Sequence, residues 1–293
     1  MKTLWHSQFL AQLKRHRITG KRLKNGHHKG SRLATHHGSS LEFSDYQMYE
    51  LGDDVRQIDW NVYARTEKVY IKRYLDEREI KVHIYLDCSN SMLIEDRKWK
   101  RAKELAGALS FLALSNDDRL SLHCMGAHHQ KCFMKKGARD AKAILHDIQE
   151  LSLDRTGEDG ISFFEEVGKG VRKKSSVSFI LSDGFESLSL IEEALRKLSI
   201  RREMVYFIQL LDEEELTPSY QGDVKLLDSE KHKETNVSIS PRMVELYQER
   251  LLYHNKEIEA LCNKWRFGYT QTSCLPPLNE IFFKDLKENG WIR

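Results

Sequence analysis

Short runs of consecutive apolar residues alternate along the chain with longer segments in which apolar residues recur every three or four positions. The short runs predict buried strands over residues 82–86, 119–124, 177–181 and 204–211. The three-to-four-residue spacing predicts amphipathic helices over residues 98–115, 138–151, 162–174, 189–198, 241–265 and 278–288. Ser240 is expected to cap the helix that begins at Pro241, because serine and proline favour these two positions.

The alternation of strands and helices predicts an α/β fold in which parallel strands are joined by right-handed crossovers. The strands are apolar without strict alternation, as is typical of a sheet covered by helices on both faces. Ligands of such sheets bind beyond the carboxyl ends of the strands. Asp87 and Asp183 each stand where a predicted core strand runs into a loop, so they are the first candidates for a functional site.

The charge of the chain is divided unevenly between its beginning and the rest. Residues 1–41 contain nine lysines and arginines and no acidic residue, whereas the whole chain has 47 basic and 44 acidic residues. We expect residues 1–40 to form a basic arm, 41–80 to pack on the core, and 81–293 to form the α/β domain with a C-terminal helical extension. Such an arm can contact a nucleic acid or an acidic partner, or lie on its own acidic body.

Composition excludes several classes of protein. A chain of 293 residues, 40% of them apolar, can bury a core without a metal or disulfide staple. Apolar stretches such as 205–211 are far shorter than the ~20 residues that a membrane-spanning helix needs. The five cysteines are scattered and lack a Cys-x-x-Cys spacing, which favours reduced thiols and a cytoplasmic protein.

The loop after the first core strand places one carboxylate and two hydroxyls on alternate residues, at Asp87, Ser89 and Ser91. With Asp183 from a later strand, these oxygens suit an octahedral cation such as Mg²⁺ or Mn²⁺. Hydroxyl ligands leave such an ion under-neutralised, so that it can take a carboxylate from a partner protein. In the alternative interpretation, Asp87 and Ser89 only cap the following helix and bind loop amides.

Two sequence elements resemble a known bacterial family. Residues 87–91 and 181–184 look like the metal-ion-dependent adhesion site of von Willebrand factor A domains. A longer string upstream is similar to the family catalogued as domain of unknown function 58: Gly52-Asp53-Asp54-Val55-Arg56-Gln57-Ile58-Asp59-Trp60. The resemblance covers roughly residues 30–290 and implies a Rossmann-like, von Willebrand factor A-type parallel sheet flanked by helices.

The resemblance also implies a ligand set and a partner. It assigns Asp87, Ser89, Ser91 and Asp183 to a site for Mg²⁺, Mn²⁺ or Ca²⁺ and calls for a threonine between them. This chain departs from the family's Gly-Gly-Thr-Asp-Leu at residues 157–161. Three alternatives follow: Ser162 takes the threonine's place, Thr156 does so from a longer loop, or the metal site is degenerate. Members of the family are often linked to MoxR-type AAA+ ATPases, which implies such a partner in chaperone-like assembly or maturation.

A dense group of charged and aromatic residues lies within the upstream string: Asp53, Asp54, Arg56, Asp59, Trp60, Tyr63 and Arg65. Opposite charges beside aromatic rings usually fix a fold, so this group is expected to form a collar that docks the segment on the sheet domain. The alternative is a catalytic or partner-binding surface. No Gly-x-Ser-x-Gly, His-Glu-x-x-His or phosphate-binding loop accompanies it.

The leading hypothesis is therefore a non-enzymatic, cytoplasmic interaction module that captures an acidic side chain through a bound divalent ion. A metal-dependent phosphohydrolase with Asp87 as its nucleophile is the first alternative, although such enzymes need an acid where this chain has Ser89. Nucleic-acid binding through the basic arm is the second. A lysine filling the pocket, or carboxylates that point apart, would show that the docking mechanism is wrong.

Overall fold

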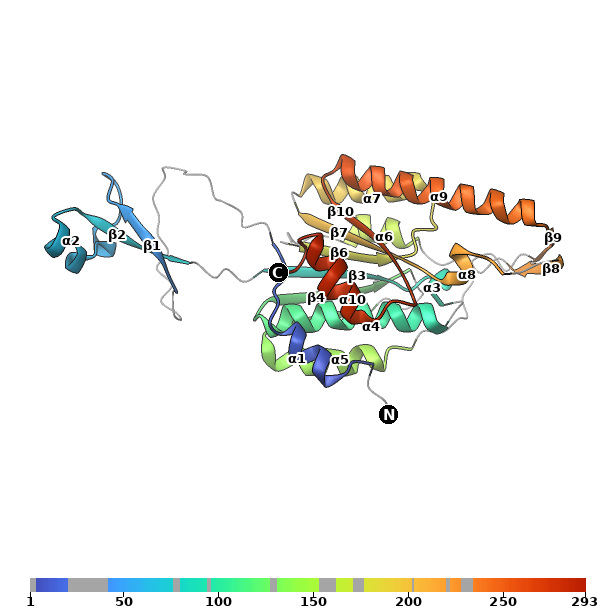
Figure 1. Ribbon diagram of the computed structural model, residues 1–293, viewed down its shortest axis with the longest axis horizontal. Helices are drawn as coiled ribbons and strands as arrows, with labels where there is room; N and C mark the ends of the chain where they lie inside the picture. The colour runs from blue at the N-terminus through green and yellow to red at the C-terminus, as the bar shows by residue number, and fades with distance from the viewer. Residues whose placement is uncertain are drawn as a thin grey trace. The chain divides into compact units, whose positions relative to one another are not determined.

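The computed structural model describes residues 4–20, 42–75, 80–93, 96–126, 131–152, 162–170, 177–201, 203–219, 222–227 and 234–293. The chain divides into two compact units, Met1–Arg22 with Ile80–Arg293, and Leu23–Glu79 (Figure 1). Among the described residues, no helix combines the length and the apolar character that crossing a bilayer requires.

The larger unit is built on a six-stranded sheet in the order β10-β7-β6-β3-β4-β5. Its strands are β3 (Lys81–Asp87), β4 (Arg119–Met125), β5 (Lys131–Lys136), β6 (Val177–Ser182), β7 (Met204–Leu211) and β10 (Gly268–Ser273). Only β5, at one edge, runs antiparallel to its neighbour. The predicted α/β fold with a mainly parallel sheet is therefore confirmed.

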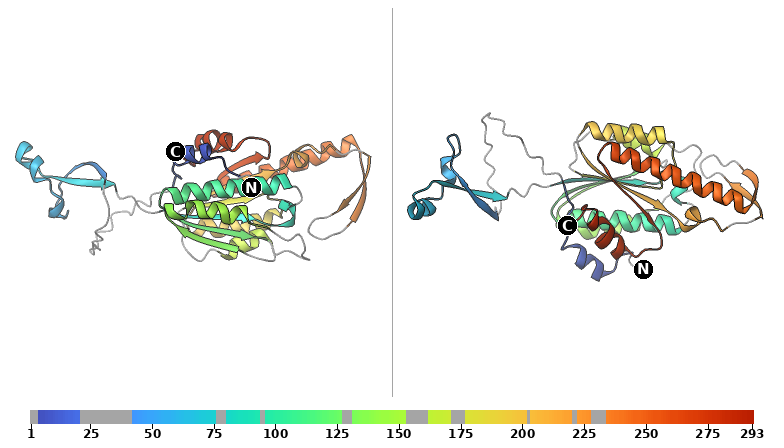
Figure 2. Two further views of the ribbon diagram at one scale, coloured as in Figure 1. Left: turned by 90° about the horizontal axis from the view of Figure 1, so that it is seen from below. Right: turned by 45° about the horizontal axis from the view of Figure 1, so that its top comes forward.

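Helices cover both faces of this sheet, as its uniformly buried central strands require (Figure 2). One face packs against α1 (Ser7–Leu13), α4 (Asp96–Ser115) and α5 (Ala141–Gln149), and the other against α6 (Phe163–Gly170), α7 (Leu188–Ile200) and α9 (Pro241–Lys264). Ser240 caps α9 as predicted, since its hydroxyl accepts a hydrogen bond from the Met243 amide at 3.3 Å.

Three predicted helices differ from the observed elements. The segment predicted at 138–151 begins as a 3-10 turn before α5, and the last helix is a short α10 (Leu278–Glu280) continued by a π-helical turn over Ile281–Leu286. In the segment predicted at 162–174, α6 covers Phe163–Gly170, and residues 171–174 lie outside the described residues.

Further elements of the structure are short. Helices α3 (Asn90–Leu93) and α8 (Glu213–Leu216) follow β3 and β7, and strand β8 (Gly222–Leu227) pairs antiparallel with β9 (Glu234–Ile239).

The predicted boundary of the basic arm at residue 40 is wrong. Phe9 and Leu13 are four residues apart on one face of α1, and Trp5 precedes the helix. All three side chains are buried in the core beside α4. Ile18 then forms a β-bridge with Ile292 near the end of the chain. Residues 4–20 therefore belong to the sheet unit, and the rest of the predicted arm, residues 21–40, lies outside the described residues.

The smaller unit contains the charged string and is described by itself. Strands β1 (Glu42–Met48) and β2 (Tyr70–Leu75) pair antiparallel around α2 (Trp60–Thr66). Asp59 caps α2 by accepting hydrogen bonds from the Asn61 and Val62 amides, and the Tyr46 hydroxyl donates to its second oxygen at 3.0 Å. The string thus fixes local structure, as expected, whereas its docking on the sheet unit stays a prediction.

The stability of the sheet unit should depend on pH through His123 on β4. Its ring stacks on that of His83 with centroids 5.4 Å apart. Burial, and then the charge of His83, lowers the pKa of His123 to about 4 from an ordinary value near 6.5. The folded chain therefore favours the neutral ring, and stability is full above pH ~6.5 and falls as the pH drops towards ~4, by up to about 1.4 kcal/mol per unit.

The variant His123→Phe keeps an aromatic ring and cannot take up this proton. We expect its free energy of unfolding, measured by urea denaturation across this pH range, to fall less steeply than that of the natural chain. The exposed His146 offers the matched control, because His146→Phe should leave the slope unchanged. Equal slopes for His123→Phe and the natural chain would show that His123 does not supply the acid sensitivity.

Candidate functional site

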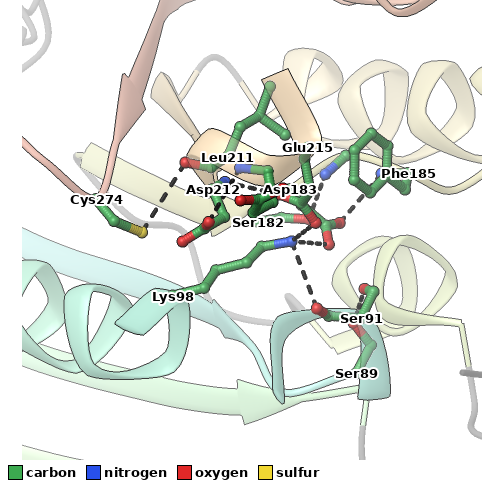
Figure 3. A network of polar contacts seen from close by, with 12 residues as sticks. Ser89, Ser91, Lys98, Ser182, Asp183, Phe185, Leu211, Asp212, Glu215 and Cys274 are labelled. Carbon is green, nitrogen blue, oxygen red and sulfur yellow. Dashed lines mark hydrogen bonds and ion pairs between the residues drawn. The ribbon is translucent and has the colours of Figure 1, made fainter. Parts of the chain in front are cut away.

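The candidate site lies at the carboxyl ends of two neighbouring parallel strands, β3 and β6. Asp87 is the last residue of β3, and Asp183 follows the last residue of β6. Because the strands run in the same direction, both carboxyl groups reach the same edge of the sheet, where the loop carrying Ser89 and Ser91 also begins. Figure 3 shows Ser89, Ser91 and Asp183 at this edge. The structure thus brings four of the six predicted site residues to one edge.

Asp87 is held rigidly and almost completely buried. One of its oxygens accepts a hydrogen bond from the Ser89 amide at 2.9 Å, and the other accepts one from the Ser182 hydroxyl at 2.6 Å. Gly126, at a φ of +84°, allows this close packing, since a Cβ there would lie 3.2 Å from the carboxylate. Burial, and then the negative charge of Asp183, raises the pKa of Asp87 to about 7. A carboxyl group so enclosed is poorly placed to act as a nucleophile.

The hydroxyl oxygens of Ser89 and Ser91 lie 3.0 Å apart. Two neighbouring ligands of an octahedral Mg²⁺, at bond lengths of about 2.1 Å, stand about 3 Å apart. In the structure this separation is that of a hydrogen bond between the two hydroxyls, and it also matches the spacing of two neighbouring ligands of one hard cation. In the alternative interpretation, Asp87 and Ser89 only cap the following helix and bind loop amides. It is confirmed in part, because Asp87 accepts a hydrogen bond from the Ser89 amide within the same loop.

Lys98, on the first turn of α4, extends between Ser91 and the carboxylates of Asp183 and Glu215 (Figure 3). Its ammonium nitrogen lies 2.8 Å from Asp183, 2.6 Å from Glu215 on α8, and 3.4 Å from the Ser91 carbonyl oxygen. The side chain is only 1% exposed. Burial alone would lower the pKa of Lys98, but the charges of Asp183 and Glu215 outweigh it and raise the pKa.

Lys98 corrects the predicted ligand set. Asp183 does not present a free carboxylate, because Lys98 pairs with one oxygen and the Phe185 amide donates to the other at 3.1 Å. The cluster nevertheless sets three carboxyl groups, those of Asp87, Asp183 and Glu215, against one ammonium. Both oxygens of Asp87 likewise accept hydrogen bonds, which leaves the hydroxyls of Ser89 and Ser91 as the candidate ligands of a divalent cation. The residues do not fit a cation bound directly to Asp183, and Lys98 is the lysine in the pocket that was expected to count against the docking mechanism.

The predicted replacement for the family's threonine has other partners. Ser162 precedes α6, and its hydroxyl donates to Glu186 while accepting from the Glu165 amide at 3.1 Å. The Phe163 amide binds the second oxygen of Glu186 at 2.6 Å. Ser162 thus starts α6 and fixes Glu186, and its place as a metal ligand stays a prediction. Thr156 lies outside the described residues.

The sequence contains a signal for Lys98 that lies outside its recognisable motifs. Lys98 shares the apolar face of its helix with Ala102, Leu105 and Leu109, at the same three-to-four-residue spacing. A lysine on a buried face must meet a carboxylate, because an unpaired buried charge is costly. Glu215 carried no comparable signal, since it stands in an acidic run, residues 212–215, that resembles an exposed turn.

Residues 45–257 match the sequence model of a family described as "Protein of unknown function DUF58". The chain is 25% identical over 253 residues to the uncharacterized proteins Mb1516 of Mycobacterium bovis and Rv1480 of Mycobacterium tuberculosis, covering 85% of this chain and 79% of theirs.

The solved structures that resemble this chain do so with TM-scores below 0.5 and low sequence identity. A conserved hypothetical protein BatB from Bacteroides thetaiotaomicron is 13% identical with a TM-score of 0.44, covering 72% of this chain and 98% of that one. The SpRpn10 VWA domain is 11% identical with a TM-score of 0.40, covering 72% and 95%. Likenesses at this level carry no inference about function.

Proposed function

Because this chain belongs to the DUF58 family, whose description assigns no activity, we propose from its own site that it is a non-enzymatic protein-interaction module. Its docking site is the carboxyl edge of the central sheet. The observation that carries the proposal is the pair of hydroxyls of Ser89 and Ser91, 3.0 Å apart beside the buried Asp87. Ligands of open α/β sheets bind beyond the carboxyl ends of the strands, which is where this pair lies.

The proposed cation is Mg²⁺, with Mn²⁺ or Ca²⁺ as substitutes. Ser89 and Ser91 hold it through their hydroxyls, and Asp87 supplies the nearest negative charge. When bound, the ion offers an open position to a carboxylate, because two neutral hydroxyls leave most of its charge uncompensated. The ammonium of Lys98 pairs with the carboxylate of Asp183, so that this carboxylate does not neutralise the charge of the bound ion.

The proposed partner presents an acidic side chain to this edge. The family resemblance implies a MoxR-type AAA+ ATPase that acts in chaperone-like assembly or maturation. We propose this ATPase as the partner to test. Scattered cysteines without a disulfide-type spacing support a cytoplasmic place for both proteins. Binding of a nucleic acid by the basic residues of the first 40 positions remains an untested alternative.

A pull-down of the purified ATPase by the natural chain in Mg²⁺ tests the proposal. The double variant Ser89→Ala/Ser91→Ala should reduce retention by about tenfold or more, because it removes both proposed hydroxyl ligands. A chelator alone would be ambiguous, since the ATPase itself needs Mg²⁺.

The chain offers a matched control for this experiment. Ser187 and Ser189 have the same spacing in the sequence, and their hydroxyls lie 3.1 Å apart. Both are exposed at the start of α7, Ser187 as its N-cap residue and Ser189 in its first turn. Ser187→Ala/Ser189→Ala should retain the ATPase fully. Equal retention by both double variants would exclude the Ser89–Ser91 pair as the docking site.

A further inference from the structure

A second cluster of potential ligands lies at the carboxyl ends of β7 and β10. The parallel register pairs Leu211 with Ser273, so the next residues, Asp212 and Cys274, leave the sheet side by side. Glu213, the first residue of α8, completes the group. One ligand atom from each of Asp212, Glu213 and Cys274 lies within 4.8 Å of the other two.

Two carboxylate oxygens in this cluster are buried without a hydrogen-bond partner among the described residues. Asp212 is completely buried, and its first oxygen accepts from the Glu214 amide at 3.2 Å and from Arg97 at 3.3 Å, while its second is unsatisfied. Glu213 accepts the Leu275 amide at 3.1 Å with one oxygen, and its other oxygen is unsatisfied. Unpaired buried carboxylate oxygens are costly and call for a cation.

The thiol of Cys274 is held only weakly by the chain. Its sulfur lies 3.9 Å from the Leu211 carbonyl oxygen, a long contact for a weak donor (Figure 3). Burial, and then the negative charge of Asp212, raises the pKa of the Cys274 thiol to about 12. A zinc-class cation displaces the thiol proton of a cysteine that it binds.

We propose that Asp212, Glu213 and Cys274 form a binding site for a divalent cation of the zinc class. Two carboxylates and a thiolate match the ligands of this borderline-soft ion, and a water would complete a tetrahedron. Ligand atoms of such a tetrahedron stand about 3.5 Å apart, so small side-chain rotations close the present cluster onto an ion. Mg²⁺ does not suit the site, because it prefers oxygen ligands alone.

The site stands apart from the Ser89–Ser91 pair and does not depend on the proposed function. It is joined to that region through α8, because the Asp212 amide donates to Glu215 at 2.7 Å and Glu215 pairs with Lys98. A cation on Asp212 and Glu213 would fix the first turn of α8. It would thereby hold Glu215 against Lys98 and tie the segment after β10 to the end of β7.

Cobalt titration of the full chain tests this site, because Co²⁺ substitutes for Zn²⁺ and a thiolate ligand gives it a charge-transfer absorption band. We expect the natural chain to show the band and Zn²⁺ to abolish it by displacement. Cys274→Ser should abolish the band and weaken Co²⁺ binding by about tenfold or more. Cys132→Ser, at an exposed thiol, is the matched control and should retain both.

Asp212→Asn provides a second variant, because asparagine still caps the start of α8 and so preserves the fold. It should weaken Co²⁺ binding while thermal unfolding without metal stays close to that of the natural chain. A band that persists in Cys274→Ser, a band that disappears in Cys132→Ser, or the absence of any band in the natural chain would each overturn the site. None of these results bears on the Ser89–Ser91 pair, whose variants are separate.

Discussion

Replacing Lys98 with methionine should lower the free energy of unfolding by about 3–5 kcal/mol, the usual cost of removing one partner from a buried ion pair. The ammonium group is 1% exposed and pairs with both Asp183 and Glu215. Methionine fills a similar volume, so the loss comes from two carboxylates left without a counter-ion. Urea denaturation at neutral pH measures the change.

Lys100→Met is the matched control, because Lys100 lies on the same helix and is 62% exposed. Its contact with Glu104, at 4.0 Å and four residues away, should contribute less than about 0.5 kcal/mol. Adding Asp183→Asn to Lys98→Met should recover part of the lost stability, because it removes one of the stranded charges. A loss below about 1 kcal/mol in Lys98→Met would contradict the ion pair.

Replacing Phe9 with alanine should also destabilise the chain strongly, by about 3–5 kcal/mol. Phe9 is buried in α1, and its ring lies 5.7 Å from that of Phe282 and 5.8 Å from that of Phe283. The side chain thus packs α1 against the π-helical turn over Ile281–Leu286. The expected loss combines the transfer of the ring to water with the cavity that it leaves. Thermal or urea unfolding measures it.

The exposed neighbour Gln8 supplies the control, because Gln8→Ala changes the same helix without touching the core. Its stability should stay within about 0.5 kcal/mol of the natural chain. If Phe9→Ala were as stable as Gln8→Ala, residues 4–20 would be a detachable arm, as their basic composition first indicated.

The central architecture could be predicted because its signals are local. Continuous apolar runs identified the four inner strands of the sheet, and helical spacing identified α4, α7 and α9. The two edge strands, β5 and β10, were not predicted from the sequence, and the reason is physical. Residues of β5 alternate between exposed and half-buried, and β10 is mostly polar, so neither contains the apolar run of an inner strand. The first helix, α1, was not predicted because it is seven residues long with two buried positions, Phe9 and Leu13, and lies in a segment that was characterised by its nine basic residues.

The candidate site was predictable only in part. Alternate oxygen side chains after a core strand identified Asp87, Ser89 and Ser91, and parallel topology placed Asp183 beside them. The pairing of Asp183 with Lys98 joins residues 85 positions apart, and Glu215 lies 117 positions from Lys98. Spacing along the chain does not reveal such contacts, because they depend on how α4 and α8 approach the sheet.

Calorimetric titration with Mg²⁺ tests most directly the claim that the Ser89–Ser91 pair holds a divalent ion. The account predicts that the natural chain and Ser187→Ala/Ser189→Ala bind Mg²⁺ alike and that Ser89→Ala/Ser91→Ala binds it at least about tenfold more weakly. An absence of Mg²⁺ binding by the natural chain would contradict the account, and it would leave the ammonium of Lys98 as the cation of this site.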